Sequence, residues 1–528
     1  MKRIKYVLPL LSLTLFSLAT SAQVINDVNK QVTKYGQAIF YINSYYLDTV
    51  NVEMLTEEAV KSVMSKLDPH STYISAKDVK SMNEPLEGNF EGVGIEFAII
   101  GDTLTVTAPI AGGPCERVGI RTGDRIIMVD GELITGIGLT TEKVHKYLRG
   151  PKGTKVTLGV VRKDVPERLD FVVERDKIPI NSLDAAYEVA NGVYYLKLGR
   201  FAQNSSEEIL KALIDLKANK INGIILDLRS NSGGFLGTAL EIANFFLDGG
   251  QTIVYTEGLR SPKRVEVATG TGFYKKGPLV VMIDENSASA SEIVAGAIQD
   301  WDRGTIVGRR SFGKGLVQQM LPLNDGSQLR LTVARYHTPS GRVIQSPYKA
   351  GEADNYYKAF LERYKSGELF NRDSISFPDS LKYKTLVKGR TVYGGGGIMP
   401  DIFVPADTSK YSDYYSNLIR KGILNDFMSG LGDKNRVEWS AKYKTFAQFE
   451  KEFRIDDQML KDLVSFAEKK SLPLDEKGFE TSKDEIVVIM KALAARTVFG
   501  SSAYYRVINA ESDETFKKAL ELINSSGL

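Results

Sequence analysis

Hydrophobic residues recur at helical spacing in the first part of the chain. Val60, Val63 and Leu67 lie three or four residues apart, which is typical of the apolar face of a helix. Pro69 follows and ends the pattern, because proline cannot continue a helix. We therefore predict an N-terminal helical region over residues 23–85.

Short strand patterns and glycine turns replace the helical spacing over residues 86–178. Residues 93–100 and 104–107 are strand-like and are joined by a Gly-Asp turn. Residues 141–148 suit a short helix, and residues 153–162 suit a further strand. This segment is predicted to form a small, β-rich domain.

Uninterrupted apolar strands alternate with helices over residues 179–406. The strands at 223–228 and 279–284 are apolar on both faces, and helical patterns follow at 236–247 and 291–300. Strands that are apolar on both faces are buried on both faces, so we predict an α/β core with a largely parallel sheet.

Helical spacing returns over residues 407–528, where the chain is rich in charged residues and has no catalytic motif. We predict a C-terminal helical region there. The whole chain has 528 residues, 43% of them hydrophobic and 25% charged, which is ordinary for a globular protein of several domains.

The first 22 residues resemble a secretory signal peptide. Three basic residues come first, residues 6–18 are apolar, and small residues precede a cleavage point at Gln23. The alternative is an uncleaved membrane anchor, but the apolar stretch is shorter than the ~20 residues that a span needs. We expect a cleaved signal and a protein located in the periplasm or cell envelope.

Charge and metal-binding residues exclude several functions. Without the first 22 residues the chain has 65 basic and 65 acidic residues, so no charge pattern favours nucleic acid or an anionic membrane. The single cysteine, Cys115, excludes an internal disulfide, and the three histidines are too scattered for a metal motif. We expect neither a metal nor a cofactor.

Two segments suggest a nucleophile and its base. Ser289 stands between two alanines before an apolar helix, which leaves room for a substrate carbonyl, although a helix cap is the alternative. Lys314 lies in a glycine turn where burial would lower its pKa enough to make it a base, although a surface lysine is the commoner case. Gln318, four residues on, could hold the amine. A serine–lysine pair is a known variant of the catalytic triad.

A glycine pair offers a third element. Gly233 and Gly234 follow a strand and precede a helix, a geometry that exposes backbone N–H groups for an oxyanion hole. Glycine pairs are common in turns, so this pattern is weak by itself.

A nucleotide-binding loop is a competing interpretation. Residues 308–314 fit the first seven positions of a P-loop. The eighth position should be serine or threonine but is Gly315, and a strand-like segment follows in place of a helix. We therefore reject this interpretation.

The β-rich segment resembles a PDZ domain. The stretches GDRIIMVDG and GPKGTKVTLGVVR carry the resemblance. It places the loop that binds a peptide's terminal carboxylate at Gly92, Val93, Gly94 and Ile95. Such a loop points N–H groups at the carboxylate while the peptide adds a strand to the sheet edge.

From about residue 30 to about residue 405 the chain resembles the C-terminal processing peptidases, or tail-specific proteases. The segments LDLRSNSGG, NSASASEIVAGAIQD, GRRSFGKGLVQ, YHTPSGRVIQ and GGGGIMPDI carry the resemblance. It implies that Ser289 is the nucleophile, Lys314 the base and Gln318 the residue that orients the lysine. It also implies oxyanion donors at the N–H of Ala290 and at Gly233 or Gly234.

The resemblance implies a Clp-protease/crotonase-like α/β core, preceded by the PDZ domain and flanked by the two helical regions. The implied activity is endoproteolysis of exported proteins near their C-termini, with tails recognised by the PDZ domain. Relatives often dimerise and some use adaptor proteins, so a homodimer and an adaptor are suggested partners. The alternative is a non-catalytic PDZ scaffold, which would not need Ser289, Lys314 and Gln318 together.

Overall fold

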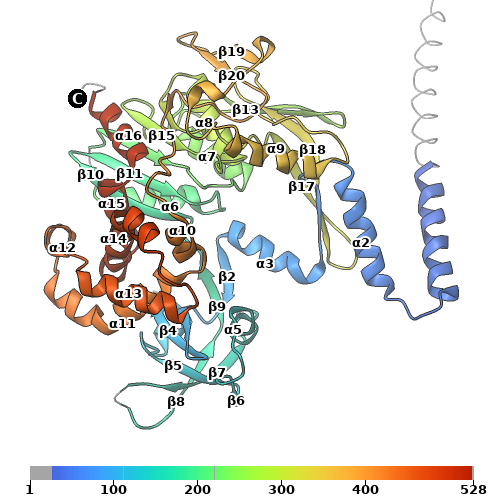
Figure 1. The fold of residues 1–528 in the computed structure, drawn as a ribbon. Coiled ribbons are helices and arrows are strands. Elements are labelled where there is room, and N and C mark those ends of the chain that lie inside the picture. Colours follow the sequence, from blue (N-terminus) through green and yellow to red (C-terminus); the bar gives the residue numbers. More distant parts are fainter. Residues whose placement is uncertain (1–26, 111, 164, 219, 526–528) are drawn as a thin grey trace, which may run out of the picture.

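The computed structural model describes residues 27–110, 112–163, 165–218 and 220–525. The predicted signal peptide, residues 1–22, lies outside this part. Residues 27–45 are helical and lie at the periphery of the molecule (Figure 1). The next elements are α2 (Val52–Ser65), β1 (Thr72–Ile74) and α3 (Ala76–Glu87). No described helix is long and apolar enough to cross a membrane.

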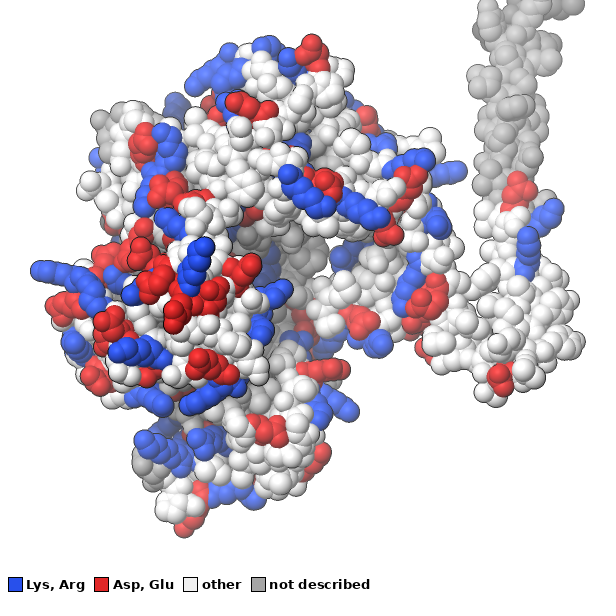
Figure 2. Space-filling model, viewed as in Figure 1, with Lys and Arg blue, Asp and Glu red and all other residues white. Residues whose placement is uncertain are grey.

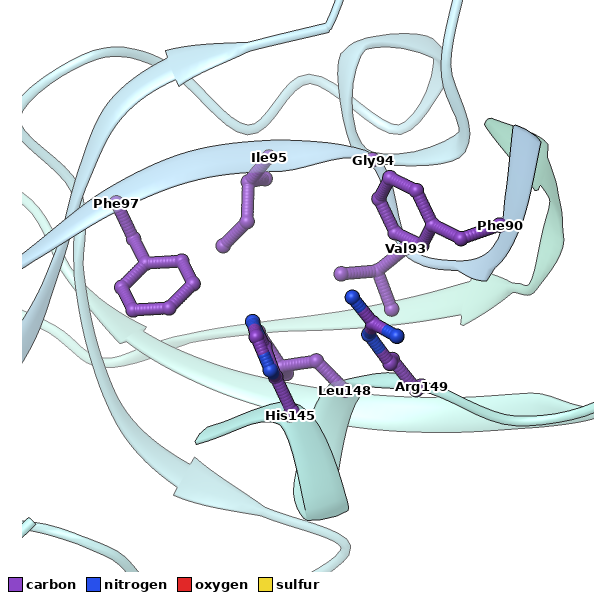
Figure 3. Close-up of a pocket in the computed structure, with 8 residues that line it drawn as sticks. All are labelled: Phe90, Val93, Gly94, Ile95, Phe97, His145, Leu148 and Arg149. Carbon is purple, nitrogen blue, oxygen red and sulfur yellow. The ribbon is translucent and has the colours of Figure 1, made fainter. Parts of the chain in front are cut away.

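The β-rich segment forms an antiparallel sheet in the order β3-β4-β5-β7-β8, with β6 paired to β5. The first strand, β3, is therefore an edge strand, and helix α5 lies close to it (Figure 3). The elements are β2 (Asn89–Gly92), β3 (Ile95–Ile100), β4 (Thr103–Pro109), α4 (Pro114–Arg117), β5 (Arg125–Val129), β6 (Glu132–Leu133), α5 (Thr141–Leu148), β7 (Lys155–Val161), β8 (Leu169–Glu174) and β9 (Asp176–Pro179), the last pairing with β2.

A six-stranded sheet in the order β10-β11-β12-β15-β16-β21 forms the centre of the core. All its pairings are parallel except β10 with β11. This confirms the predicted α/β core. The strands are β10 (Leu183–Ala190), β11 (Val193–Leu198), β12 (Gly223–Asp227), β15 (Leu279–Ile283), β16 (Thr305–Gly308) and β21 (Ile402–Phe403).

Helices cover both faces of this sheet, as the continuous apolar strands require. Ile224 and Leu226 of β12 pack in one cluster with α6 (Ser205–Asp215), α7 (Leu236–Asn244) and α8 (Ala290–Asp300). Ile225, on the opposite face, packs in a second cluster with Phe516 and Ile523 of α16 (Glu514–Ser525). The last helix of the chain is therefore part of the core, far in sequence from the strands that it covers.

A second sheet packs beside the core in the order β1-β18-β13-β14, with β17 also paired to β18. It joins the N-terminal region to the core, because Thr72 of β1 pairs with Arg330 of β18. Its other members are β13 (Thr252–Gly258), β14 (Ser261–Val267), β17 (Leu316–Pro322) and β18 (Gln328–His337). Helix α9 (Ala353–Lys365), the 3-10 turns Arg372–Ser374 and Asp379–Leu381, and the hairpin β19 (Lys382–Lys384) and β20 (Thr391–Tyr393) follow.

The predicted C-terminal helical region is helical in the structure, with its own apolar cluster. It comprises α10 (Asp413–Arg420), α11 (Ile423–Lys442), α12 (Phe446–Glu452), α13 (Asp457–Lys469), α14 (Glu476–Phe499), α15 (Ser501–Glu511) and α16. Helix α11 reaches the β-rich sheet, where Arg436 donates to the carbonyl of Thr107 at 3.3 Å. On the face drawn in Figure 2, acidic and basic side chains are interspersed, and the helix over 27–45 is mostly uncharged.

Candidate active site

Three loops that follow neighbouring parallel strands carry the predicted catalytic residues. Strands β12, β15 and β16 lie side by side and run in the same direction. Their carboxyl ends therefore open onto the same edge of the sheet, where ligand sites of α/β proteins form. The loops that follow carry Gly233, Ser289 and Lys314, so the fold brings together residues that the sequence separates.

Ser289 occupies a strained position directly before α8. Its backbone has φ 56° and ψ −111°, a conformation that residues with a side chain rarely adopt. Such strain costs ~1–3 kcal/mol and is concentrated at functional sites. The side chain is partly exposed, whereas Ala288 and Ala290 on either side are buried. The turn thus presents the serine hydroxyl while its neighbours fix the backbone.

The side chain of Gln318 in β17 binds the amine of Lys314, which lies two residues before this strand. Lys314 Nζ donates to Gln318 Oε1 at 3.0 Å. Burial lowers the pKa of the Lys314 amine from its ordinary value, and the positive charge of Arg330 lowers this pKa further. Both effects favour the neutral amine, which is the form that can accept a proton.

The backbones of Ser289 and Lys314 are joined through the buried carboxylate of Glu292. Its Oε2 accepts the N–H groups of Ser289 at 2.8 Å and Lys314 at 2.9 Å. Its Oε1 accepts from the Ser311 hydroxyl at 2.6 Å and the Gly313 N–H at 2.7 Å. Burial raises the pKa of Glu292 to about 7, although the four hydrogen bonds favour the carboxylate. One side chain therefore sets the separation between the two residues.

The buried hydroxyl of Tyr336 makes a second connection. It lies within hydrogen-bonding distance of the Ser289 carbonyl, at 3.2 Å, and of the Lys314 carbonyl. The two segments are thus linked through their N–H groups by Glu292 and through their carbonyls by Tyr336. Within the described chain, Ser289 Oγ and Lys314 Nζ do not share a hydrogen bond, so these links fix the backbones and leave the side chains to adjust.

The N-terminal region contributes to the site through the turn at His70. Gln318 Nε2 donates to the His70 carbonyl at 2.5 Å, while its Oε1 accepts from Lys314. Asp68 Oδ1 fixes the turn by accepting the N–H groups of His70 and Ser71, both at 2.8 Å. Burial lowers the pKa of His70 to about 4, and the charge of Lys314 acts in the same direction.

The glycine pair lies against the Ser289 turn. A Cβ on Gly233 would be 2.9 Å from both Ser289 Cβ and the Ala290 nitrogen. The N–H of Gly233 donates to Asn231 Oδ1 at 2.9 Å. By contrast, the N–H groups of Gly234 and Ala290 make no hydrogen bond within the described residues, and Gly234 is exposed.

A pocket lies between edge strand β3 and helix α5, at the predicted carboxylate loop. It is lined by Phe90, Val93, Gly94, Ile95, Phe97, His145, Leu148 and Arg149, and Figure 3 shows the side chains of strand and helix facing each other. Three of the four predicted loop residues thus line it, and Gly92 lies just before them. Gly94 has φ 76°, and a Cβ there would be 3.0 Å from Ile178.

The sequence-based prediction did not include Glu292, Tyr336 and His70 among the site residues. Glu292 has a local signal, since a serine followed three residues later by glutamate fits a capping box at the start of a helix. Tyr336 and His70 have none, because their contacts with the site span 47 and 248 positions of the sequence.

Comparison with known proteins gives three family matches. The model of peptidase family S41 matches residues 192–350, that of the PDZ domain matches residues 105–162, and a family of unknown function matches residues 414–500. The second match confirms the predicted PDZ domain. Helix α16 and Asp513, the residue directly before it, lie outside all three matches.

Curated relatives are similar over most of their length. The chain is 36% identical to a carboxy-terminal-processing protease of Bartonella bacilliformis, over 63% of this chain and 78% of that protein. It is 32% identical to the carboxy-terminal processing protease CtpB of Bacillus subtilis, over 65% of this chain and 72% of that protein. Among solved structures, a photosystem II D1 C-terminal processing protease is 29% identical over 59% of this chain and 83% of that chain, with a TM-score of 0.34.

Proposed function

Because this chain belongs to the carboxy-terminal-processing serine proteases of peptidase family S41 and carries a PDZ domain, we propose that it uses a Ser289–Lys314 dyad to cleave exported proteins near their C-termini. The observation that carries the dyad is the double link through Glu292 and Tyr336. It holds a strained serine and a half-buried lysine beside the N–H groups of Gly234 and Ala290, which make no hydrogen bond among the described residues.

The proposed reaction begins with the neutral amine of Lys314. As Ser289 Oγ attacks the substrate carbonyl carbon, Lys314 Nζ takes the hydroxyl proton and becomes charged. Its bond to Gln318 keeps the amine oriented. The distance between Oγ and Nζ shortens when substrate binds, as catalytic hydrogen bonds often do.

Charge that develops on the carbonyl oxygen is stabilised by backbone N–H groups. We assign Ala290 and Gly234 to this role, because the N–H of Gly233 is already bonded to Asn231. Collapse of the tetrahedral intermediate breaks the C–N bond, and Lys314 returns the proton to the leaving amine. A water, deprotonated by Lys314, then hydrolyses the acyl-enzyme and restores Ser289.

The PDZ pocket is the proposed site for the substrate's tail. A tail would pair with edge strand β3 and place its terminal carboxylate at the loop before Ile95. Val93, Ile95 and Leu148 give this end of the pocket apolar walls, and the guanidinium of Arg149 beside them is paired with Glu84, so an apolar last residue suits the pocket best.

Export and assembly belong to the same proposal. The signal-like segment supports cleavage before Gln23, which N-terminal sequencing of the secreted protein would test.

A homodimer or an adaptor would need an exposed surface. The helix over residues 27–45 offers one through Val32, Phe40 and Tyr41, each more than half exposed. Light scattering with and without this helix would test it.

The decisive experiment compares cleavage of an unfolded reporter that ends in an apolar tail, by the unmutated protein and by Ser289→Ala. We expect cleavage by the unmutated protein alone. The same reporter with a charged last residue should be cleaved more slowly, and its KM should rise. Equal cleavage by both proteins would place the nucleophile elsewhere. Binding of the tail without cleavage by either would favour the PDZ scaffold.

A further inference from the structure

The guanidinium of Arg229 lies between two carboxylates that are far apart in sequence. Its Nη2 donates to Asp227 Oδ2 and to Asp513 Oδ2, each at 2.6 Å, and its Nη1 donates to Asp513 Oδ1 at 3.0 Å. Asp227 ends β12, whereas Asp513 directly precedes α16. The two-pronged contact with Asp513 is the geometry in which an arginine–carboxylate pair is strongest.

Asp513 balances the charge of a buried cluster. Lys197 Nζ lies 3.5 Å from Asp227 Oδ1, so the directly paired groups are two cations and two anions. The side chains of Asp227, Lys197 and Asp513 are only 1%, 9% and 9% exposed. A buried charge without a partner is costly, so removing one member of such a network destabilises the groups that remain. Without Asp513 the cluster would hold one positive charge too many.

The same arginine begins the loop that leads to the glycine pair. Its carbonyl accepts from Lys197 Nζ, and its own N–H donates to Asp227 Oδ1 at 2.9 Å. Ser230 follows with φ 55° and is tied to Asp284 Oδ1 at 2.8 Å. A strained conformation of this kind persists only where the surroundings hold it in place.

The loop in turn contacts the serine turn. The carbonyl of Asn231 accepts from the Ala288 N–H at 3.0 Å and from the Ser291 hydroxyl at 2.8 Å. A shift at Arg229 would therefore reach both the N–H of Gly234 and the backbone beside Ser289. The backbone of residues 229–234 therefore connects the Asp513 contact to the proposed oxyanion hole.

We propose that Asp513 is a positioning residue for the peptidase, through which the last helix of the chain fixes the loop that carries the oxyanion donor. The proposal rests on the proposed function. It assigns a task to a residue outside every family match: the C-terminal region completes the active site and does not only pack beside it.

The test compares Asp513→Ser with the unmutated full chain. Serine removes the charge but can still cap α16, since Asp513 Oδ1 now accepts the Phe516 N–H at 3.0 Å and serine is a favoured N-cap. Glu511→Gln is the matched control. It breaks the pair of Glu511 with Lys491, at 2.6 Å, in the same helical region and does not contact Arg229.

We expect kcat on the tailed reporter to fall about 10- to 100-fold in Asp513→Ser, because small displacements of catalytic groups have effects of that size. KM should stay within about twofold, since the PDZ pocket is unchanged. A peptide boronic acid, which forms a tetrahedral adduct with the serine, should bind more weakly by the same factor as kcat/KM. Asp513→Glu should recover part of the rate, and Glu511→Gln should behave as the unmutated protein.

Two outcomes would overturn the proposal while the unmutated protein is active. One is an unchanged kcat in Asp513→Ser. This kcat is measured well below the variant's own unfolding temperature, so that partial unfolding does not lower the measured rate. The other is an equal loss in Asp513→Ser and Glu511→Gln, which would indicate general weakening of the helical region. Inactivity of the unmutated protein would instead overturn the proposed function itself.

Discussion

The backbone N–H of Lys314 donates to the carboxylate of Glu292 at 2.9 Å, although Glu292 lies in the first turn of α8 and Lys314 lies in the loop after β16. The same oxygen accepts the N–H of Ser289 at 2.8 Å. The proposed nucleophile and the proposed base are therefore positioned by a group that takes no part in the proposed proton transfer. Four groups donate hydrogen bonds to the two carboxylate oxygens of Glu292. A side-chain amide in place of this carboxylate would bring its own N–H donors against some of these groups.

We predict that Glu292→Gln lowers kcat by about 10- to 100-fold. Each oxygen of Glu292 accepts two hydrogen bonds, and the NH₂ group of glutamine, which cannot accept, would stand in place of one of these oxygens. Polar groups would then be left without a partner, which lowers the free energy of unfolding by ~1–3 kcal/mol. Kinetics at pH 8, above the pKa of about 7, and urea unfolding would measure both effects. Ser311→Ala removes a single donor to the same carboxylate and should cost much less. Equal effects of the two substitutions would contradict this account.

Gln318→Glu is predicted to shift the pH dependence of hydrolysis to higher pH. A carboxylate beside Lys314 Nζ stabilises the charged amine, so the pKa of Lys314 rises and less of the base is neutral at pH 7. The plot of log kcat/KM against pH would measure the shift. Gln319→Glu places the same charge on the next, exposed residue of β17 and serves as the control. If both variants moved the profile equally, Gln318 would not be the contact that matters.

His70 is predicted to make stability fall as the medium becomes acidic. Its pKa is about 4 in the folded protein and 6.5 when unfolded, so between these values the unfolded chain binds more protons. The free energy of unfolding therefore decreases as pH falls from 6.5 to 4, by on the order of 2 kcal/mol from this residue. Urea unfolding of the unmutated protein and of His70→Gln at pH 7 and pH 5 would isolate the contribution. The difference in free energy of unfolding between the two proteins should be smaller at pH 5 than at pH 7. An equal difference at both pH values would contradict the prediction.

Gly94→Ala is predicted to impair recognition of the tail more than the chemistry. The new Cβ would lie 3.0 Å from Ile178 and 3.2 Å from Pro114, which forces the loop that lines the PDZ pocket to move. We expect KM for the tailed reporter to rise about tenfold with kcat nearly unchanged. Gly101→Ala is a matched control: the φ of Gly101 is also positive, at 56°, but none of the described residues has an atom within 4 Å of the added Cβ. Both variants carry similar backbone strain, so a rise in KM common to both would point to destabilisation of the domain.

Local sequence patterns predicted the elements on which the site is built. Continuous apolar runs such as residues 279–283 mark the strands of the central sheet, and glycines mark turns near them. The serine, lysine and glutamine of the candidate site could be named because each stands in a short, distinctive segment of one loop or strand. The resemblance to a PDZ domain places the carboxylate loop, and three consecutive residues of that loop line the pocket in the structure.

The α/β core, the PDZ domain and the candidate catalytic residues follow from the sequence alone, because they rest on periodicity, on motifs a few residues long and on the family resemblance that those motifs carry. The contacts that hold these residues in place appear only in the folded structure: Tyr336 contacts the Ser289 and Lys314 carbonyls, His70 contacts Gln318, and Asp513 contacts Arg229. A hydrogen bond depends on distance in space and not on distance along the chain. Partners separated by 47, 248 and 284 positions leave no mark on local hydrophobic spacing and meet only when the sheets and the last helix pack together.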